Sequence, residues 1–370
     1  MLDPRPPVDP SRLAWITVGG CLGALSLGLL LQMLSMPVGL WFTEVFGLLA
    51  VAWALTRWSG RAPARYVRLT WPGLPAVLFA AGLGIANYVG LAIPLQGLSR
   101  SLFPADWLES FDPTRAILQQ SPVDLWLTAG AAVLGAAVCE EFTFRGVVQQ
   151  GFSADAPHAG QGVVRAALIF GLFHFNPVNF VALFEIGVFL GLLFRRSGSL
   201  VPGIVAHGTQ NALVLAVLLR ERDLPPSAGE EGWRTYVGLG GMGMVALVML
   251  LLFARRFPAV WGRPRPVPAV RERVPLTRAF APWLVAASAL LLAWSAVDRR
   301  GIELGVADLR IPVPLARDTE SEALRVARAK LDALRLRVRT GQAPLREYLE
   351  SRRALAESLN EPTPMLQRAK

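Results

Sequence analysis

Apolar residues run along the chain in stretches of roughly 18 to 24 residues, separated by short polar or arginine-rich segments. A helix needs about 20 mostly apolar residues to cross a hydrocarbon core of about 30 Å. The pattern therefore predicts an all-α fold, a polytopic bundle of transmembrane helices. The nine predicted spans are residues 13–34, 38–56, 74–96, 124–149, 164–176, 180–194, 199–219, 236–254 and 280–297.

The fifth and sixth predicted spans are separated by a break at FNPVN, residues 175–179. Proline lacks an amide hydrogen and disfavours helical geometry in the residue before it, so Asn176 and Pro177 are expected to end the helix. The segment 164–176 is too short to cross about 30 Å at 1.5 Å per residue. We therefore expect this helix to span only part of the membrane.

The residues after the last predicted span differ from the rest of the chain. In 298–370 charged residues alternate with leucine and alanine, which predicts a soluble helical hairpin. Thr319 and Glu322 have the spacing of a capping box at the start of the first helix. Gly341 and Pro344 separate the two helices. A protein partner could bind this tail. The predicted organisation is 1–120 N-terminal spans, 121–220 core, 221–297 C-terminal spans and 298–370 tail.

Net charge adds information about partners. The formal charge is +10, which would suit a nucleic-acid partner if it gathered on one soluble face. Arginines instead flank the apolar spans, as expected for charge that fixes orientation in a lipid bilayer. We expect no nucleic-acid partner. The richness in arginine, alanine and proline is typical of a bacterial protein, so the predicted location is the bacterial inner (plasma) membrane, with multiple passes.

Several polar side chains nevertheless fall inside the predicted spans. A charged group at membrane depth costs roughly 2.5 to 3.5 kcal/mol, so a group of them requires mutual pairing or a function. The candidate site residues are Glu140, Glu141, Arg145, His174, His207 and Asn211. Glu44 and Glu185 also lie within predicted spans, and Glu185 could line a cavity. His158 lies in a loop and is assigned no role.

Helical geometry determines which of these side chains share a face of their helix. Glu141 and Arg145 are four residues apart, so they share a face and can form an ion pair, while Glu140 points about 100° away and stays available. Counted from the expected cytoplasmic ends, Glu140, His174 and His207 lie roughly 12 to 15 Å deep, because each residue advances a helix by 1.5 Å. The three side chains could therefore meet at one level.

Two hydrolytic chemistries fit a carboxylate and two imidazoles. In one, Glu140 and a histidine act as general base on a water molecule. In the other, His174, His207 and Glu140 bind Zn(II) and leave one position open for that water. The sequence is compatible with both chemistries. The alternative without catalysis is a network of ion pairs that only stabilises the helix bundle.

Three segments together resemble a known family. EEFTFR (140–145), FGLFH (170–174) and HGTQN (207–211) are similar, in type and order, to the three motifs of the CAAX prenyl endopeptidase and bacteriocin-processing (CPBP) family. These proteins are also called Abi or type II CAAX proteases. The resemblance covers about residues 120–220 and leaves the flanking spans and the tail outside it.

The resemblance implies an intramembrane endopeptidase that cuts a membrane-anchored protein or peptide near its C-terminus or beside its anchor. Glu140 and His174 would activate water, His207 and Asn211 would stabilise the oxyanion, and Glu141 with Arg145 would orient Glu140. Both metalloprotease and metal-free mechanisms are ascribed to the family, so Zn(II) remains an option. In a bacterium, a C-terminal sorting anchor or an exported peptide is the expected substrate rather than a prenylated protein.

Two other classes of function use the same residues. A proton-coupled transporter could employ the buried groups as a relay. A non-catalytic scaffold or immunity protein of the same fold could recruit partners through the tail. The transporter predicts flux without cleavage, and the scaffold depends on residues 301–370.

Overall fold

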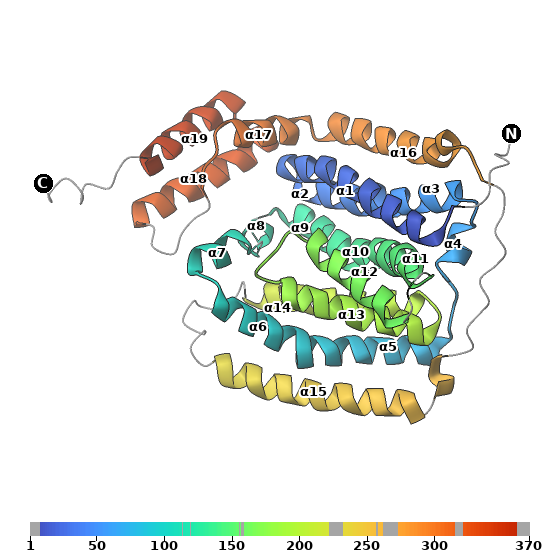
Figure 1. The fold of residues 1–370 in the computed structure, drawn as a ribbon. Coiled ribbons are helices and arrows are strands. Elements are labelled where there is room, and N and C mark those ends of the chain that lie inside the picture. The colour runs from blue at the N-terminus through green and yellow to red at the C-terminus, as the bar shows by residue number, and fades with distance from the viewer. Residues whose placement is uncertain are drawn as a thin grey trace, which may run out of the picture. The chain divides into compact units, whose positions relative to one another are not determined.

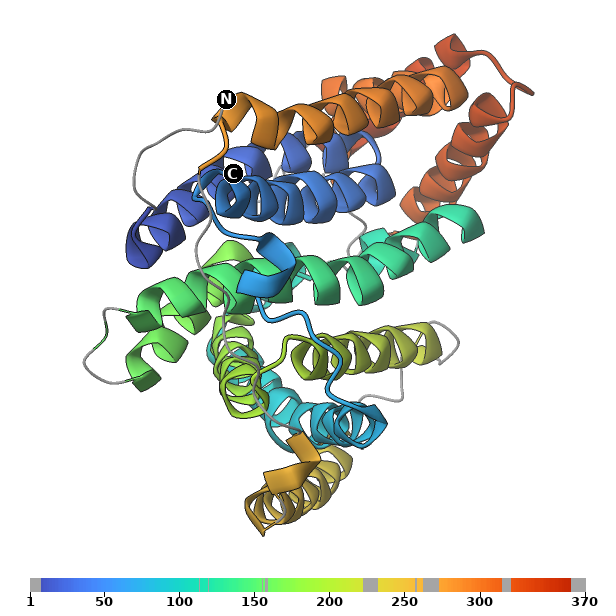
Figure 2. The same cartoon turned by 90° about the vertical axis from the view of Figure 1, so that its right-hand side faces the viewer.

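The computed structural model describes residues 8–112, 114–118, 120–154, 156, 159–221, 232–256, 258–261, 273–314 and 321–360. Helices joined by turns make up this part of the chain, with no strand, as Figures 1 and 2 show. The predicted all-α class is confirmed. His158 and Thr319 lie outside the described residues.

The helices include α-helical, π-helical (η1–η4) and 3₁₀ (η6) segments. In chain order they are α1 Pro10–Leu34, α2 Met36–Phe42, η1 Thr43–Ala50, α3 Val51–Trp58, α4 Pro63–Tyr66, α5 Leu74–Asn87, η2 Tyr88–Ala92, α6 Ile93–Leu102, α7 Ala105–Ser110, α8 Thr114–Leu118, α9 Pro122–Gly130, η3 Ala131–Gly135, α10 Ala136–Glu140, η4 Glu141–Gln149, α11 Gln150–Ala154, α12 Ala159–Phe173, α13 Phe180–Ser197, α14 Val201–Glu221, α15 Gly232–Arg256, η6 Pro258–Trp261, α16 Leu276–Val297, α17 Arg299–Arg310, α18 Glu322–Arg339 and α19 Leu345–Asn360.

Six helical segments of the described chain are long and apolar enough to cross a membrane, which makes this a multi-pass integral membrane protein. They coincide with six of the nine predicted spans. The six are Pro10–Leu34, Met36–Trp58, Leu74–Leu102, Pro122–Ala154, Val201–Arg220 and Leu276–Val297.

The other three predicted spans are helical but do not belong to that set. α12 has 15 residues and is too short, as expected. α13 has 18 residues, but three of them are charged: Glu185, Arg195 and Arg196. The count of nine therefore stays a prediction for α12, α13 and α15.

The break between α12 and α13 lies where the sequence predicts it. α12 ends at Phe173 and α13 begins at Phe180. The Asn176 side chain accepts a hydrogen bond from the amide of Asn179 at 3.0 Å and donates one to the Phe111 carbonyl at 3.1 Å. The first bond satisfies the amide of Asn179, the residue before α13, and the second connects the break to Phe111, the residue after α7.

Three spans contain π-helical turns, which the apolar pattern did not predict. η1 lies in the second span, η2 in the third, and η3 and η4 in the fourth. A π turn widens the helix and is frequent at functional sites. All nine residues of η4 are buried, so the widened turn lies in the core of the bundle.

Close approaches between helix backbones fix the surroundings of η4. A Cβ at Gly84 of α5 would lie 2.6 Å from the carbonyl oxygen of Ala206 on α14. A Cβ at Gly187 of α13 would lie 2.9 Å from the Cα of Ala167 on α12. Glycine at both positions permits backbone-to-backbone packing, a common device between membrane helices.

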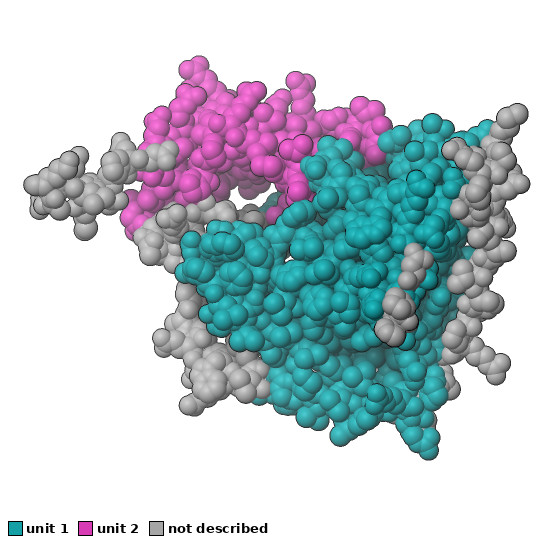
Figure 3. Space-filling view, in the orientation of Figure 1, with its two compact units in different colours: residues 1–28, 40–285 teal, residues 29–39, 286–370 magenta. Residues whose placement is uncertain are grey.

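The chain divides into two compact units, drawn in different colours in Figure 3: residues 1–28 with 40–285, and residues 29–39 with 286–370. The first contains α3 to α15. The second contains the tail, where α18 and α19 pair as the predicted hairpin and α17 packs against α18. The sequence analysis did not predict α17.

The start of α18 differs from the expected capping box. Ser321, not Thr319, is the N-cap, and its hydroxyl accepts a hydrogen bond from the amide of Leu324 at 3.3 Å. Serine two residues further along caps equally well and places Glu322 in the first turn, where it interacts favourably with the helix dipole.

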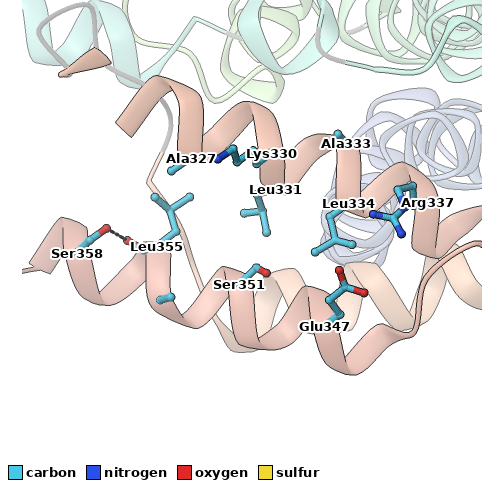
Figure 4. Close-up of a pocket in the computed structure, with 11 residues that line it drawn as sticks. Ala327, Lys330, Leu331, Ala333, Leu334, Arg337, Glu347, Ser351, Leu355 and Ser358 are labelled. Carbon is cyan, nitrogen blue, oxygen red and sulfur yellow. Dashed lines mark hydrogen bonds between the residues drawn. The ribbon is translucent and has the colours of Figure 1, made fainter. Parts of the chain in front are cut away.

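A groove of about 630 Å³ lies between α18 and α19. Figure 4 shows Leu331 and Leu334 of α18 and Leu355 of α19 pointing into the space between the two helices. These leucines are buried together with Leu304 and Tyr348 in one apolar cluster. The leucines of the tail therefore form a small hydrophobic core.

Tyr348 is expected to ionise abnormally late among the four tyrosines of the chain. Burial, and then a hydrogen bond at 2.6 Å to the carboxylate of Asp308, raise the pKa of Tyr348 to about 12. In a spectrophotometric titration of tyrosinate, the native protein should show a step near this value. Tyr348→Phe should lack that step, and an unchanged titration would contradict the contact.

Candidate active site

A buried ion pair lies in the π-helical segment η4. Nη1 of Arg145 donates to Oε1 of Glu141 at 2.6 Å, and their side chains are 1% and 0% exposed. Nη2 of Arg145 donates to the carbonyl of Gly187 at 3.3 Å, and the guanidinium lies 4.3 Å from the ring centroid of Phe170. The predicted pair is therefore present. Its additional partners offset part of the cost of burying both charges.

His207 of α14 joins this pair to Glu140. Its Nδ1 lies 3.1 Å from Oε1 of Glu141, and its Nε2 lies 3.8 Å from Oε2 of Glu140. A single carboxylate oxygen of Glu141 thus contacts both Arg145 and His207. A carboxylate on one ring nitrogen fixes the orientation of an imidazole.

His174 lies in the turn that follows α12, with its ring exposed. Its Nδ1 is 2.9 Å from the carbonyl oxygen of Phe170. Because a carbonyl only accepts, this bond requires the proton on Nδ1 and leaves Nε2 as an acceptor. Within the described residues, no hydrogen bond or ion pair joins His174 to Glu140.

The ring of Phe170 contacts both histidines. Its centroid is 4.8 Å from that of His174 and 6.1 Å from that of His207. Phe170 is 1% exposed and also contacts the guanidinium of Arg145. This phenylalanine therefore fixes the positions of both imidazoles relative to η4.

Asn211 lies one helical turn after His207 on α14. Its Nδ2 donates to the carbonyl of Ala132 at 2.8 Å, in the π-helical segment η3. A primary amide has a second N–H, which stays available. The chain therefore brings Asn211 to the same helix, α9–η3–α10–η4, that carries Glu140, Glu141 and Arg145.

Several buried polar atoms near these groups have no hydrogen-bond partner among the described residues. They include Oε2 of Glu140, Oε2 of Glu141 and both side-chain atoms of Gln210. Buried polar groups are nearly always hydrogen-bonded, to protein or to water. Unsatisfied acceptors beside an imidazole are suited to bind a water molecule or a peptide group.

The zinc interpretation is not supported. In the described part of the chain, no group of three or more His, Cys, Asp or Glu side chains could hold a metal ion. Glu140 and His207 are neighbours, but His174 contacts Phe170 instead of completing a set with them. We therefore derive no step through a metal.

Sequence reasoning missed the backbone acceptors of this site. The carbonyls of Gly187 and Ala132 receive Arg145 and Asn211, but any residue type supplies a carbonyl, so no sequence signal marks them. It also missed the contact between Glu141 and His207, which lie 66 residues apart. Their similar predicted depth was the one available indication.

Gly203 of α14 leaves room for Glu141. A Cβ at this position would lie 2.9 Å from Oε2 of Glu141, whose side chain is held by Arg145 and His207. We expect Gly203→Ala to displace this carboxylate and to lower activity about tenfold, as for loss of one hydrogen bond to a charged group. The matched control is Gly208→Ala on the same helix, where the new Cβ would lie 3.5 Å from the Cβ of Ala137, an ordinary contact. Equal activities of the two variants would contradict this account.

Comparison with known proteins identifies the family to which part of the chain is similar. Residues 122–213 match the model of the type II CAAX prenyl endopeptidase Rce1-like family, whose members are CAAX-type intramembrane proteases. The matched range contains all six candidate residues, from Glu140 to Asn211. The searches of curated proteins and of solved structures gave no match. The resemblance seen in the three motifs is therefore confirmed, and this chain carries an Rce1-like type II CAAX prenyl endopeptidase domain.

Proposed function

We propose that the chain is an intramembrane endopeptidase that hydrolyses a peptide bond near the C-terminus or the membrane anchor of a membrane-associated substrate. The observation that carries the proposal is the buried cluster of Glu140, Glu141, Arg145 and His207 inside the matched range. His174 is linked to this cluster through the ring of Phe170, which contacts both His174 and His207.

Glu140 is the proposed general base. One of its carboxylate oxygens is buried without a hydrogen-bond partner in the described chain, so it can accept a proton from a water molecule. Nε2 of His174 accepts the other proton of that water in a hydrogen bond and orients it. The water oxygen then attacks the scissile carbonyl carbon, and Glu140 later returns its proton to the leaving amine.

His207 and Asn211 are the proposed oxyanion stabilisers. The contact of Nδ1 with Oε1 of Glu141 orients the ring of His207, so that an N–H on Nε2 can donate to the developing negative charge. The second N–H of Asn211 donates to the same oxygen. Arg145 balances the charge of Glu141 and keeps this carboxylate in place.

The substrate is a membrane-anchored protein or peptide. The six spans embed the site in the bundle, which favours substrates that reach it from the bilayer. For a bacterial inner-membrane protein, as the composition suggests, the candidates are a C-terminal sorting anchor or an exported peptide.

A cleavage assay with His174→Phe tests the proposal. The purified chain in lipid vesicles is incubated with a quenched fluorescent peptide anchored by a C-terminal lipid, and the products are identified by mass spectrometry. We expect the native protein to release one defined fragment and His174→Phe to be slower by about a hundredfold or more, because phenylalanine keeps an aromatic ring but lacks the orienting acceptor. His174 is exposed, so the thermal midpoint should be unchanged. Equal rates for the two proteins would contradict the role of His174.

A further inference from the structure

Arginines gather where the second span ends. Trp58 is the last residue of that span, and Leu74 is the first residue of the third. The connection between them contains Arg61, Arg65 and Arg68, on and beside α4, which Figure 1 shows next to the end of α3. This connection lies outside the matched range 122–213, and the proposed mechanism does not use it.

Two of these arginines lie deeper than a role in membrane orientation requires. A charge that only fixes orientation can stay exposed, as Arg65 does. Arg61 is instead 8% exposed, and Arg68 is half-buried. Removing a guanidinium from water is costly unless hydrogen-bond acceptors or an opposite charge take the place of the water.

Arg61 has acceptors within the chain and positions Tyr66. Its Nη1 donates to the hydroxyl of Ser59 at 3.0 Å, and its Nη2 donates to the carbonyl of Val8 at 2.8 Å. Its Cζ lies 5.2 Å from the ring centroid of Tyr66. The hydroxyl of Tyr66 is buried and has no hydrogen-bond partner among the described residues, although the residue is only 8% exposed.

Arg68 is different, because its donors lack acceptors. Within the described residues its side chain forms no hydrogen bond or ion pair, and its Nε is buried. Its Cζ lies 5.8 Å from the ring centroid of Phe194 on α13. An aromatic face attracts a guanidinium but leaves the N–H groups in the guanidinium plane without acceptors. Arg68 and Tyr66 are two residues apart, so their Cα atoms lie within about 7 Å.

The backbone holds Arg68 in this place. Its φ is 55°, in the left-handed region that residues other than glycine rarely adopt. The amide of Arg68 donates to the carbonyl of Arg65 at 3.1 Å, and the carbonyl of Arg68 accepts from the amide of Leu200, just before α14, at 3.0 Å. Strained conformations persist only where the surroundings hold them, and they are common at sites that clamp a ligand.

A third aromatic contact adds a cation at the end of the second span. Cζ of Arg273 lies 5.4 Å from the ring centroid of Trp58, and its Nε is also buried without a partner in the described chain. Among the described residues, no carboxylate forms an ion pair with Arg61, Arg68 or Arg273. The charge of this group is therefore left for an anion from outside the chain to balance.

We propose that Arg68 and Tyr66 bind the phosphate group of an anionic lipid headgroup. A phosphate offers several acceptor oxygens to a guanidinium, and anionic lipids present it at the depth where a span ends. The N–H groups of Arg68 and the hydroxyl of Tyr66 donate to these oxygens, and Arg61 acts only by positioning Tyr66. Lipid binding requires no peptide cleavage, so its test is independent of the function proposed above.

Native mass spectrometry of the full chain, released from detergent with phosphatidylglycerol added, measures this binding. We expect one phosphatidylglycerol to bind about tenfold or more tightly than zwitterionic phosphatidylcholine. Arg68→Gln should raise the Kd for phosphatidylglycerol about tenfold, as for loss of a hydrogen bond to a charged group. Tyr66→Phe removes only the hydroxyl and should raise this Kd about threefold.

Arg65→Gln is the matched control in the same segment. It removes the same charge from an exposed position, where salt screens it, so the Kd should stay within about twofold of native. Equal rises for Arg65→Gln and Arg68→Gln would show that only net charge matters and would overturn the site. The thermal midpoint reports whether Arg68→Gln is folded; if it is lowered, Tyr66→Phe, which keeps the ring and every charge, decides the test.

Two further results would overturn the proposal. Native affinity for phosphatidylglycerol in both Arg68→Gln and Tyr66→Phe would remove the proposed donors, and equal affinities for the two lipids would remove the requirement for an anionic headgroup. Millimolar inorganic phosphate separates a lipid from a free phosphate. We expect it to leave phosphatidylglycerol bound, because acyl chains hold the headgroup at the membrane surface. Displacement of the lipid would assign the site to free phosphate instead.

Discussion

Arg145→Met is expected to destabilise the protein by about 3 to 5 kcal/mol, the usual cost of removing one partner from a buried ion pair. The variant leaves the carboxylate of Glu141 buried and uncompensated. It also removes the hydrogen bond to Gly187 and the contact with the ring of Phe170. A lowered thermal midpoint in detergent, measured at matched protein concentration, would report the loss.

A second substitution separates the effect of the uncompensated charge on stability from the effect of lost packing contacts. In the double variant Arg145→Met with Glu141→Gln, the uncompensated charge is gone, so part of the lost stability should return. Arg195→Met, at an exposed position of α13, serves as the control for removal of an arginine and should leave the midpoint nearly unchanged. A midpoint of Arg145→Met equal to that of Arg195→Met would contradict the buried pair.

Glu140→Gln is expected to lower kcat by about 10² to 10⁴, the range typical of a positioned general base. Glutamine keeps the shape of the side chain but cannot accept the proton of water. Because Oε2 of Glu140 has no hydrogen-bond partner in the described chain and Nε2 of His207 is 3.8 Å from it, the substitution should leave the thermal midpoint close to the native value. Peptide cleavage by single-turnover kinetics gives the rate of the chemical step.

The matched control is Glu185→Gln on α13. Glu185 accepts a hydrogen bond from Asn87 at 3.4 Å, and within the described part of the chain no hydrogen bond or ion pair joins it to the candidate site residues. Its replacement should leave kcat within about twofold of native, as usual for a change away from the reacting groups. If both glutamine variants lost activity equally, the effect of Glu140→Gln could not be ascribed to a general base.

Much of the fold was predictable because each helix that crosses a lipid bilayer needs about 20 mostly apolar residues. Apolar runs predicted the spans, and ionisable residues within them predicted the pair Glu141–Arg145 and the neighbourhood of Glu140 and His207. The break at Pro177 was predictable because proline removes a backbone donor. The three motifs then identified the domain that the family comparison confirmed.

The features that were not predicted depend on three-dimensional context. π turns leave the apolar pattern almost unchanged over five to nine residues, so η1 to η4 had no sequence signal. α17 has few apolar residues and two glycines, and its helix is stabilised by packing of Leu304 in the tail core. The contact of His207 with Glu141 required the packing of separate spans.

The most direct test of the central claim compares protein termini in membranes that carry the native chain with those that carry Glu140→Gln, at matched expression. We expect at least one membrane-anchored protein to have a trimmed terminus only with the native chain. A substrate whose terminus changes would also identify the scissile bond. Identical termini in both membranes, together with a partner or an ion flux lost from the mutant, would contradict the protease account and favour a scaffold or a transporter.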